Sequence, residues 1–132
     1  MVKSGQELEK NENIVNLSSP EKIKFIEQTC MDLLANPQED FQKINSILFL
    51  LKDTDFFVCK LSALALAEIF KDLLPLYKID RQTVEEKLKT VIPKEERKTL
   101  TYEYGLLTLY EKFLQTMYGI HSYLSKLKRG LR

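Results

Sequence analysis

The stretch that decides the fold runs over residues 58–79 and reads VCKLSALALAEIFKDLLPLYKI. At about 3.6 residues per helical turn, the polar residues Lys60, Glu68 and Lys71 fall on one narrow strip. A surface helix has an apolar stripe roughly 100° wide, so a helix that is apolar over most of its circumference should have neighbours on two or more sides. Pro75 ends the helix because it lacks an N–H and disfavours the helical conformation in the residue before it. The segment therefore predicts the central helix of a helical stack.

Two more helices are predicted before this segment, each opened by a capping residue that a proline follows. Ser19 is the expected N-cap of a helix over residues 20–35, and Asn36 is that of a helix over residues 37–52. The acidic DTD triplet then caps the central helix, expected over residues 55–74. Helices joined by so few residues run roughly antiparallel. The first part of the chain therefore predicts stacked helical hairpins.

The C-terminal part predicts a short helix over residues 83–89 and a long one over residues 93–128. Apolar residues alternate at spacings of four and three along the long helix, at Leu106, Tyr110, Phe113, Met117, Ile120, Leu124, Leu127 and Leu131. This heptad seam favours lengthwise packing against another helix, from the same molecule or from a partner. A helix of about 35 residues is about 50 Å long, against about 25 Å for the earlier helices. Part of the seam is therefore expected to face something outside this chain.

The composition favours the all-α class. Glycine and proline are scarce at four each among 132 residues, and strongly alternating β-branched runs are absent. We expect a flexible polar lead-in over residues 1–18 and a single α-helical domain over residues 19–132. The hairpins stack either as a small bundle or as the start of a HEAT-like α-solenoid, with the long helix at the C-terminal end. No repeat of fixed period decides between the two.

The net charge of +1 conceals an uneven distribution. Residues 1–75 carry eight Lys and Arg against twelve Asp and Glu, and residues 76–132 carry twelve against seven. The net charges of the two parts are therefore −4 and +5. The C-terminal tail KLKRGLR holds four of the basic residues. A basic end can meet an acidic partner or RNA, although a difference of this size is also common on solvated surfaces.

Signatures of catalysis and of metal binding are mostly absent from the sequence. His121 is the only histidine, so no histidine cluster can ligate zinc, and no glycine-rich loop is present to cradle a phosphate. Cys30 and Cys59 read as buried free thiols in a reducing compartment. Apolar runs fall short of the 18 or more residues that a membrane span needs. We expect a binding protein with no cofactor, no metal, no small-molecule substrate and no membrane insertion.

Three blocks of sequence resemble the nucleolar complex-associated protein 3 family, over roughly residues 23–118. The characteristic block matches at Val58, Lys60, Leu61, Leu66, Phe70, Lys71, Asp72, Leu74, Pro75, Tyr77, Lys78 and Ile79. An upstream helix break matches at Asn36 and Pro37, and a downstream block matches at Tyr102, Glu103, Gly105, Leu106, Tyr110 and Phe113. Family members are several times longer, so the chain is either an excised piece or a shortened homologue.

The resemblance implies a non-enzymatic factor of the nucleus, mostly of the nucleolus. It implies pairing with nucleolar complex-associated protein 2 during the assembly and export of large-subunit ribosomal precursors. An alternative is a nucleic-acid-associated module on pre-ribosomal RNA or in replication initiation, with which the family has also been linked. The mechanism expected is binding by a helical scaffold, with some RNA contact.

Residues from three places are candidates for partner binding. The loop after Pro75 offers Tyr77 and Lys78, which serve either intramolecular packing or a partner. The remaining candidates come from the seam and the basic tail: Tyr110, Phe113, Met117, Ile120, Leu124, Lys126, Lys128 and Arg129.

Overall fold

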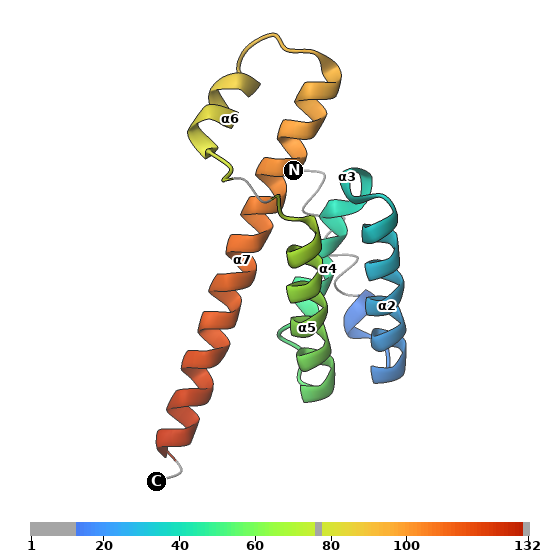
Figure 1. Ribbon diagram of the computed structural model, residues 1–132. Coiled ribbons are helices and arrows are strands. Elements are labelled where there is room, and N and C mark those ends of the chain that lie inside the picture. Colours follow the sequence, from blue (N-terminus) through green and yellow to red (C-terminus); the bar gives the residue numbers. More distant parts are fainter. Residues whose placement is uncertain (1–12, 76–77, 131–132) are drawn as a thin grey trace. The chain divides into compact units, whose positions relative to one another are not determined.

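The computed structural model describes residues 13–75 and 78–130, and every regular element in these ranges is a helix (Figure 1). The predicted all-α class and the long C-terminal helix are confirmed. The chain divides into two compact units, Met1–Leu73 and Leu74–Arg132, which are described separately below as unit 1 and unit 2. The single domain expected over residues 19–132 stays a prediction.

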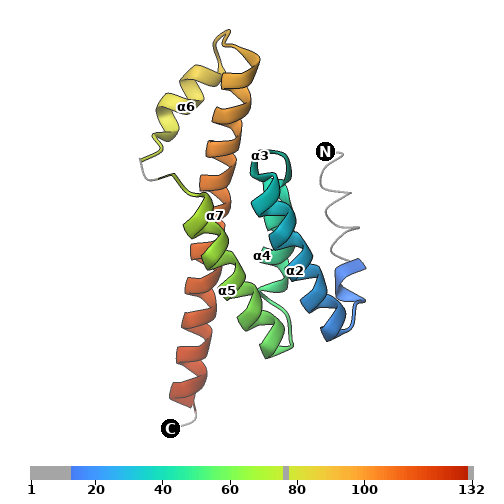
Figure 2. The same cartoon turned by 45° about the vertical axis from the view of Figure 1, so that its right-hand side comes forward.

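Unit 1 is built from consecutive antiparallel helices. Its elements are α2 (Ser19–Ala35), α3 (Pro37–Asp40), the 3-10 turn η1 (Phe41–Lys43), α4 (Ile44–Leu50) and α5 (Phe56–Leu73). In Figures 1 and 2, α2 and α5 run in the same direction and α4 runs in the opposite one. Helix α5 contacts both α2 and α4. This confirms the prediction that the largely apolar central helix has neighbours on two sides.

The start of α2 is tied to the start of α5 by two polar contacts. Ser18, one residue earlier than predicted, is the N-cap, because its hydroxyl accepts a hydrogen bond from the first turn of α2. The hydroxyl of Ser19 donates instead to the carboxylate of Asp55 at 2.5 Å. Lys22 Nζ lies 2.6 Å from Asp53 Oδ2 in a largely buried ion pair. Asp55 also accepts a hydrogen bond from the N–H of Phe57 in the first turn of α5 at 2.9 Å, so this residue both caps α5 and fastens it to α2.

The helix predicted over residues 37–52 is wrong as a single element. Asn36 is the N-cap of α3 as predicted, without a side-chain hydrogen bond, but the segment is divided into α3, η1 and α4. Side chains three residues apart eclipse in a 3-10 turn. Phe41 and Ile44 are consequently both buried, at 9% and 0% exposure.

The core of unit 1 extends into the expected lead-in. Residues 13–15 are helical, and Ile14 is 4% exposed in a cluster with Ile26, Leu50 and Val58. The prediction of a flexible segment over residues 1–18 is thus wrong for Ile14, and its first twelve residues lie outside the described range. A single apolar residue in a polar run has no period, so only tertiary contact reveals its burial.

The solvent side of α5 is wider than its sequence predicts. Phe57 and Leu64 are 58% and 60% exposed on the side of the polar residues Lys60 and Glu68. On the opposite side Ser62 is fully buried, and its hydroxyl donates to the carbonyl of the residue four positions earlier at 2.8 Å.

Unit 2 is a hairpin of α6 (Arg81–Leu88) and α7 (Lys94–Gly130), a continuous helix of 37 residues. The carboxylate of Asp80 caps α6 by accepting hydrogen bonds from the backbone N–H groups of Gln82 and Thr83. Asp80 Oδ2 also accepts a bond from the Thr83 hydroxyl, which is the main reason why its pKa is lowered. This carboxylate is therefore engaged in local capping.

Candidate functional site

Arg81, the first residue of α6, fastens α6 to the middle of α7. Its Nη2 lies 2.6 Å from Glu111 Oε2, and its Nη1 donates to the hydroxyl of Thr108 at 3.3 Å. The guanidinium also lies over the ring of Tyr104, 5.0 Å from its centroid. The Tyr104 hydroxyl in turn donates to Glu85 of α6 at 2.8 Å. The start of α6 is therefore held beside residues 104–111.

Arg97, near the start of α7, holds the other end of α6. Its guanidinium donates to the carbonyl oxygens of Leu88 at 3.0 Å and Thr90 at 2.8 Å, groups that a helix end otherwise leaves unpaired. Helix α6 has 8 residues and is about 12 Å long, whereas α7 is about 55 Å long. The part of α7 after Glu111 therefore extends beyond α6.

The heptad seam of α7 changes from buried to exposed along the helix. Leu106 is 0% exposed and Phe113 is 8% exposed, whereas Leu124 and Leu127 are 50% and 47% exposed. Met117 and Ile120, between these pairs, are half-buried, and the last seam residue lies outside the described range. The apolar stripe therefore continues well past its buried part.

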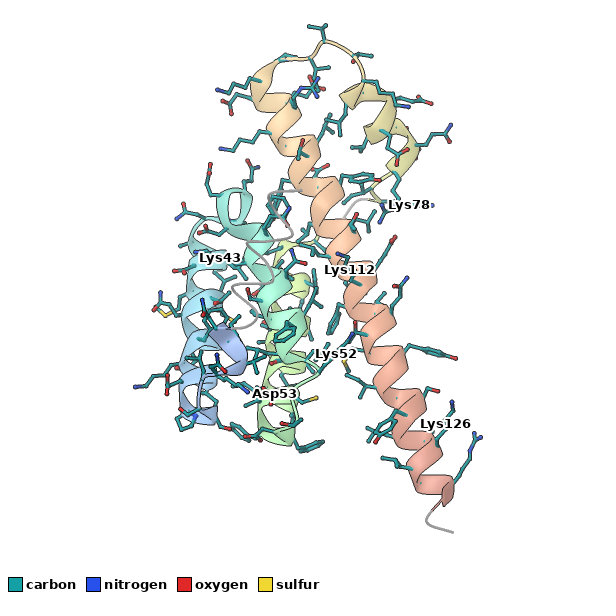
Figure 3. All side chains as sticks on the ribbon, turned by 180° about the vertical axis from the view of Figure 1, so that it is seen from behind. Lys43, Lys52, Asp53, Lys78, Lys112 and Lys126 are labelled. Atoms are coloured by element: carbon teal, nitrogen blue, oxygen red, sulfur yellow. The ribbon has the colours of Figure 1, made fainter. Side chains whose placement is uncertain are left out.

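The predicted seam residues lie on one face of α7, but the basic residues do not join them there. Tyr110 is half-buried, and its ring centroid lies 6.5 Å from that of Phe113. Lys126, Lys128 and Arg129 are exposed on the last turns, where Figure 3 shows Lys126. At about 100° per residue their directions spread over about 160° around the helix. The positive charges of the tail therefore lie on one broad side of the helix, away from Leu124 and Leu127.

The loop before α6 holds the candidates Tyr77 and Lys78. Lys78 is exposed beside the start of α6, away from the last turns of α7 (Figure 3). Tyr77 lies outside the described residues, so its binding role stays a prediction.

Exposed aromatic residues on α7 were missed as site candidates. Tyr118 is 76% exposed and Tyr123 is 63% exposed, and Leu114 is 47% exposed nearby in the sequence. The sequence favours core or interface positions for the tyrosines because leucines surround them. Helical phase is the signal that finds them, since Tyr118 lies about 100° around the helix from Met117.

The described residues include no group of three or more His, Cys, Asp or Glu placed to hold a metal ion. His121 is exposed, and the thiols of Cys30 and Cys59 are free and half-buried. Burial raises the pKa of both thiols, so they are protonated at neutral pH. In the ranges that the structure covers, no helix is long and apolar enough to cross a membrane.

A family model described as nucleolar complex-associated protein matches residues 21–113, which is more than half of the chain. The chain belongs to the nucleolar complex-associated protein family. Its relatives include nucleolar complex-associated protein 3 of Arabidopsis thaliana, 35% identical over 96 residues, and that of Schizosaccharomyces pombe, 39% identical over 85 residues. The human nucleolar complex protein 3 homolog is 32% identical over 101 residues.

These alignments cover 64% to 74% of this chain but only 11% to 12% of the relatives, so the chain spans about a tenth of their length. No solved structure matches the chain. The family resemblance is confirmed, as is the nucleolar and nuclear localisation, because the relatives are named nucleolar complex proteins. The family match ends at Phe113, so the exposed part of the seam lies beyond it.

Proposed function

We propose that the chain is a non-enzymatic helical assembly segment in ribosome biogenesis, acting by protein binding during maturation and export of large-subunit precursors. The family membership supports a place in a nucleolar complex. The observation that carries the binding role is the exposure of Leu124 and Leu127 on the same stripe as the buried Leu106 and Phe113. An uncovered continuation of a packed heptad stripe is what a partner helix needs.

The proposed mechanism is helix-on-helix packing along the second half of α7. Met117, Ile120, Leu124 and Leu127 repeat at spacings of three, four and three, so their side chains can insert between those of a facing helix. Nucleolar complex-associated protein 2 and pre-ribosomal particles are the partners that we propose. The helices of unit 1 form the start of a HEAT-like stack in this scheme.

The test is a pull-down from nuclease-treated nuclear extract, eluted across a salt series and identified by mass spectrometry. Phe113 is too buried to probe the surface, so the variant is Leu124→Glu. Gln115→Glu is the matched control, because it makes the same charge change at an exposed position on the other side of α7. We expect nucleolar complex-associated protein 2 to remain with the unmodified chain and the control, and to be lost with Leu124→Glu. Its retention by Leu124→Glu would remove the seam from the interface.

A nucleic-acid-binding role is the second candidate. The observation in its favour is the combination of exposed Tyr118 and Tyr123 with the basic residues of the last turns, since aromatic rings stack on bases and cations contact phosphates. Its test is the salt dependence of binding to single-stranded RNA, with a log–log slope of about −0.7 per phosphate contacted. Changing Lys126, Lys128 and Arg129 together to Gln should flatten that slope. An unchanged slope would exclude the last turns as the RNA contact.

A further inference from the structure

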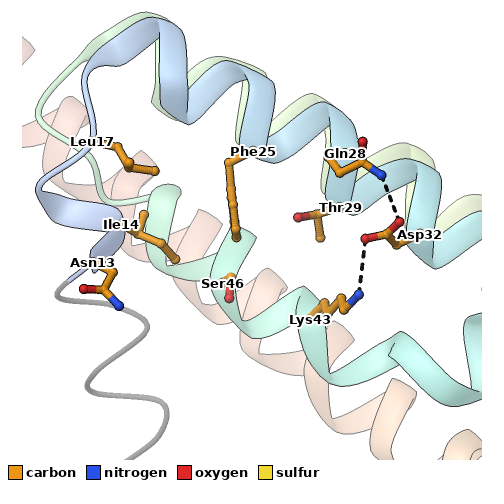
Figure 4. A pocket seen from close by; sticks show the side chains of 9 residues that line it. All are labelled: Asn13, Ile14, Leu17, Phe25, Gln28, Thr29, Asp32, Lys43 and Ser46. Atoms are coloured by element: carbon orange, nitrogen blue, oxygen red, sulfur yellow. Dashed lines mark hydrogen bonds and ion pairs between the residues drawn. The ribbon is translucent and has the colours of Figure 1, made fainter.

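A pocket of about 450 Å³ opens on unit 1, far in the sequence from the seam (Figure 4). Its walls come from the helical turn at residues 13–15, from α2 and from the η1–α4 segment. Ile14, Leu17 and Phe25 supply the apolar part of the lining, and Phe25 points from α2 into the space beside α4 (Figure 4). The volume lies within the range of about 300–1,000 Å³ of ordinary binding pockets.

Thr29 adds a polar group to the wall of this pocket. Thr29 lines the pocket although only 4% of its surface is exposed. Figure 4 shows this side chain between Phe25 and Asp32. The wall of the pocket is therefore apolar with the hydroxyl group of Thr29 beside it.

The rim of the pocket carries the ion pair of Asp32 and Lys43, and Asp40 lies next to it. Asp32 accepts hydrogen bonds from Gln28 Nε2 at 3.0 Å and from Lys43 Nζ at 3.2 Å (Figure 4). Lys43 Nζ is also 3.5 Å from a carboxylate oxygen of Asp40, so two carboxylates share one ammonium group. The hydrogen bond from Gln28 and the one from Lys43 lower the pKa of Asp32, which keeps it ionised at neutral pH. The two carboxylates exceed the one ammonium group by one charge, and unit 1 as a whole has a net charge of −4. A positively charged occupant therefore complements this charge.

We propose that this pocket is the docking site of a basic amphipathic helix from a protein partner. Apolar side chains one helical turn apart on that helix pack against Ile14, Leu17 and Phe25, and a Lys or Arg on it pairs with Asp32. This is the helix-in-groove mode, in which a few anchor residues of one helix face enter a hydrophobic groove. The site is independent of the proposed α7 interface, since it uses other residues in another unit.

The test uses a probe peptide that carries the only tryptophan in the sample, because the chain itself has none. The probe is a short helical peptide of Leu and Lys with one Trp on its apolar face, and its matched counterpart has Glu in place of Lys. On addition of the full chain, we expect the Trp emission of the Lys peptide to shift to shorter wavelength and its anisotropy to rise. The Glu peptide should show neither change. Equal binding of the two peptides, or binding of neither, would overturn the proposal.

Chain variants locate the binding. Ser46→Phe fills the pocket and should abolish binding of the Lys peptide. Asp32→Asn should weaken it about two- to fivefold, the range of a partly exposed ion pair. Asp72→Asn, the same charge change at an exposed position on α5, should leave it unchanged.

Circular dichroism shows whether Ser46→Phe is folded. If it is not folded, the comparison of Asp32→Asn with Asp72→Asn shows whether the peptide binds at the pocket. Binding that all the variants share would place the peptide elsewhere and overturn the proposal. Sedimentation of the chain without peptide measures whether the chain associates with itself. Self-association that Asp32→Asn or Ser46→Phe abolishes would make a second copy the occupant, which also overturns it.

Discussion

Units 1 and 2 are both helical, but different interactions stabilise each of them. In unit 1, α2, α4 and α5 each contribute fully buried residues, such as Leu33, Ile47 and Leu66. In unit 2, Val84 is the one buried residue of α6, α7 adds Leu106, Leu109 and Phe113, and the guanidinium groups of Arg81 and Arg97 fasten the hairpin. Unit 1 therefore has the larger set of buried apolar residues, whereas polar contacts have a larger share in fastening unit 2.

The difference bears on where partners bind. Unit 1 buries apolar residues of α2, α4 and α5, and it also has a pocket. Helix α7 has a longer apolar stripe than α6 can cover, so its unused part is a linear surface. A pocket suits a few anchor side chains, and a stripe suits a whole partner helix.

The largest expected effect comes from a substitution in the core of unit 1. Leu66→Ala removes a fully buried side chain from α5 and should lower the free energy of unfolding by about 2–5 kcal/mol. Leu64→Ala, two residues earlier and 60% exposed, should change it by less than about 0.5 kcal/mol. Urea unfolding followed by circular dichroism measures both. Equal losses of stability in the two variants would contradict the burial of Leu66 and the exposure of Leu64.

The second prediction tests the polar fastener of unit 1. Asp53→Asn leaves the ammonium group of Lys22, whose side chain is 13% exposed, without its ion-pair partner. We expect a loss of about 1–3 kcal/mol at pH 7 by urea unfolding. Asp72→Asn is the control, since Asp72 is exposed on α5 and should show almost no loss.

The same pair predicts a pH dependence of stability. Burial alone raises the pKa of Asp53, but the hydrogen bonds from Lys22 and from the Asp55 N–H outweigh it, so the pKa is lowered. The contribution of Asp53 is therefore present above its unfolded pKa of about 3.9 and is lost as the pH falls through the lower folded value. The melting temperature should fall more steeply below about pH 4 in the unmodified chain than in Asp53→Asn. Parallel curves would contradict this role of the ion pair.

The third prediction turns to the polar fastener of unit 2. Arg81→Gln removes the ion pair with Glu111 and the contact with the Tyr104 ring. These contacts are partly exposed, so we expect a loss of about 1 kcal/mol, confined to α6. Hydrogen exchange of the α6 amides should accelerate, while Lys87→Gln on the exposed side of α6 should leave it unchanged. Acceleration throughout unit 1 as well would show that the effect is not local.

Periodic features of the sequence predicted the fold, and features without a period were missed. The all-round apolar pattern of α5 correctly predicted its two neighbours, and the helical spacing of the C-terminal part correctly predicted one long helix there. The break at Phe41–Lys43 was missed because α-helices and 3-10 turns both place residues three apart on one side. The cap was misplaced by one residue because Ser18 and Ser19 are equally suitable caps before a proline.

The candidate sites were predicted unevenly for the same reason. The seam is a pattern within one helix, so its residues can be read from the sequence. The pocket combines residues from separate segments, among them Ile14, Phe25 and Lys43, whose proximity depends on tertiary packing. No pattern within one segment of the sequence identifies such a pocket.

The smallest expected effect concerns α7, whose exposed half has a glycine in its interior. A side chain at Gly119 would meet no atom within 4 Å, and α7 continues through this position as a regular helix. Gly119→Ala should therefore stabilise the C-terminal half of α7 by about 0.5–1 kcal/mol, because alanine loses less backbone entropy than glycine in a helix. Hydrogen exchange of the amides around residue 119 measures this gain in stability. Gly130→Ala at the helix end, where the space is equally open, should stabilise the helix much less. If the stripe binds a partner as a preformed helix, Gly119→Ala should also tighten that binding, whereas a weaker complex would mean that the partner requires the flexibility of this glycine.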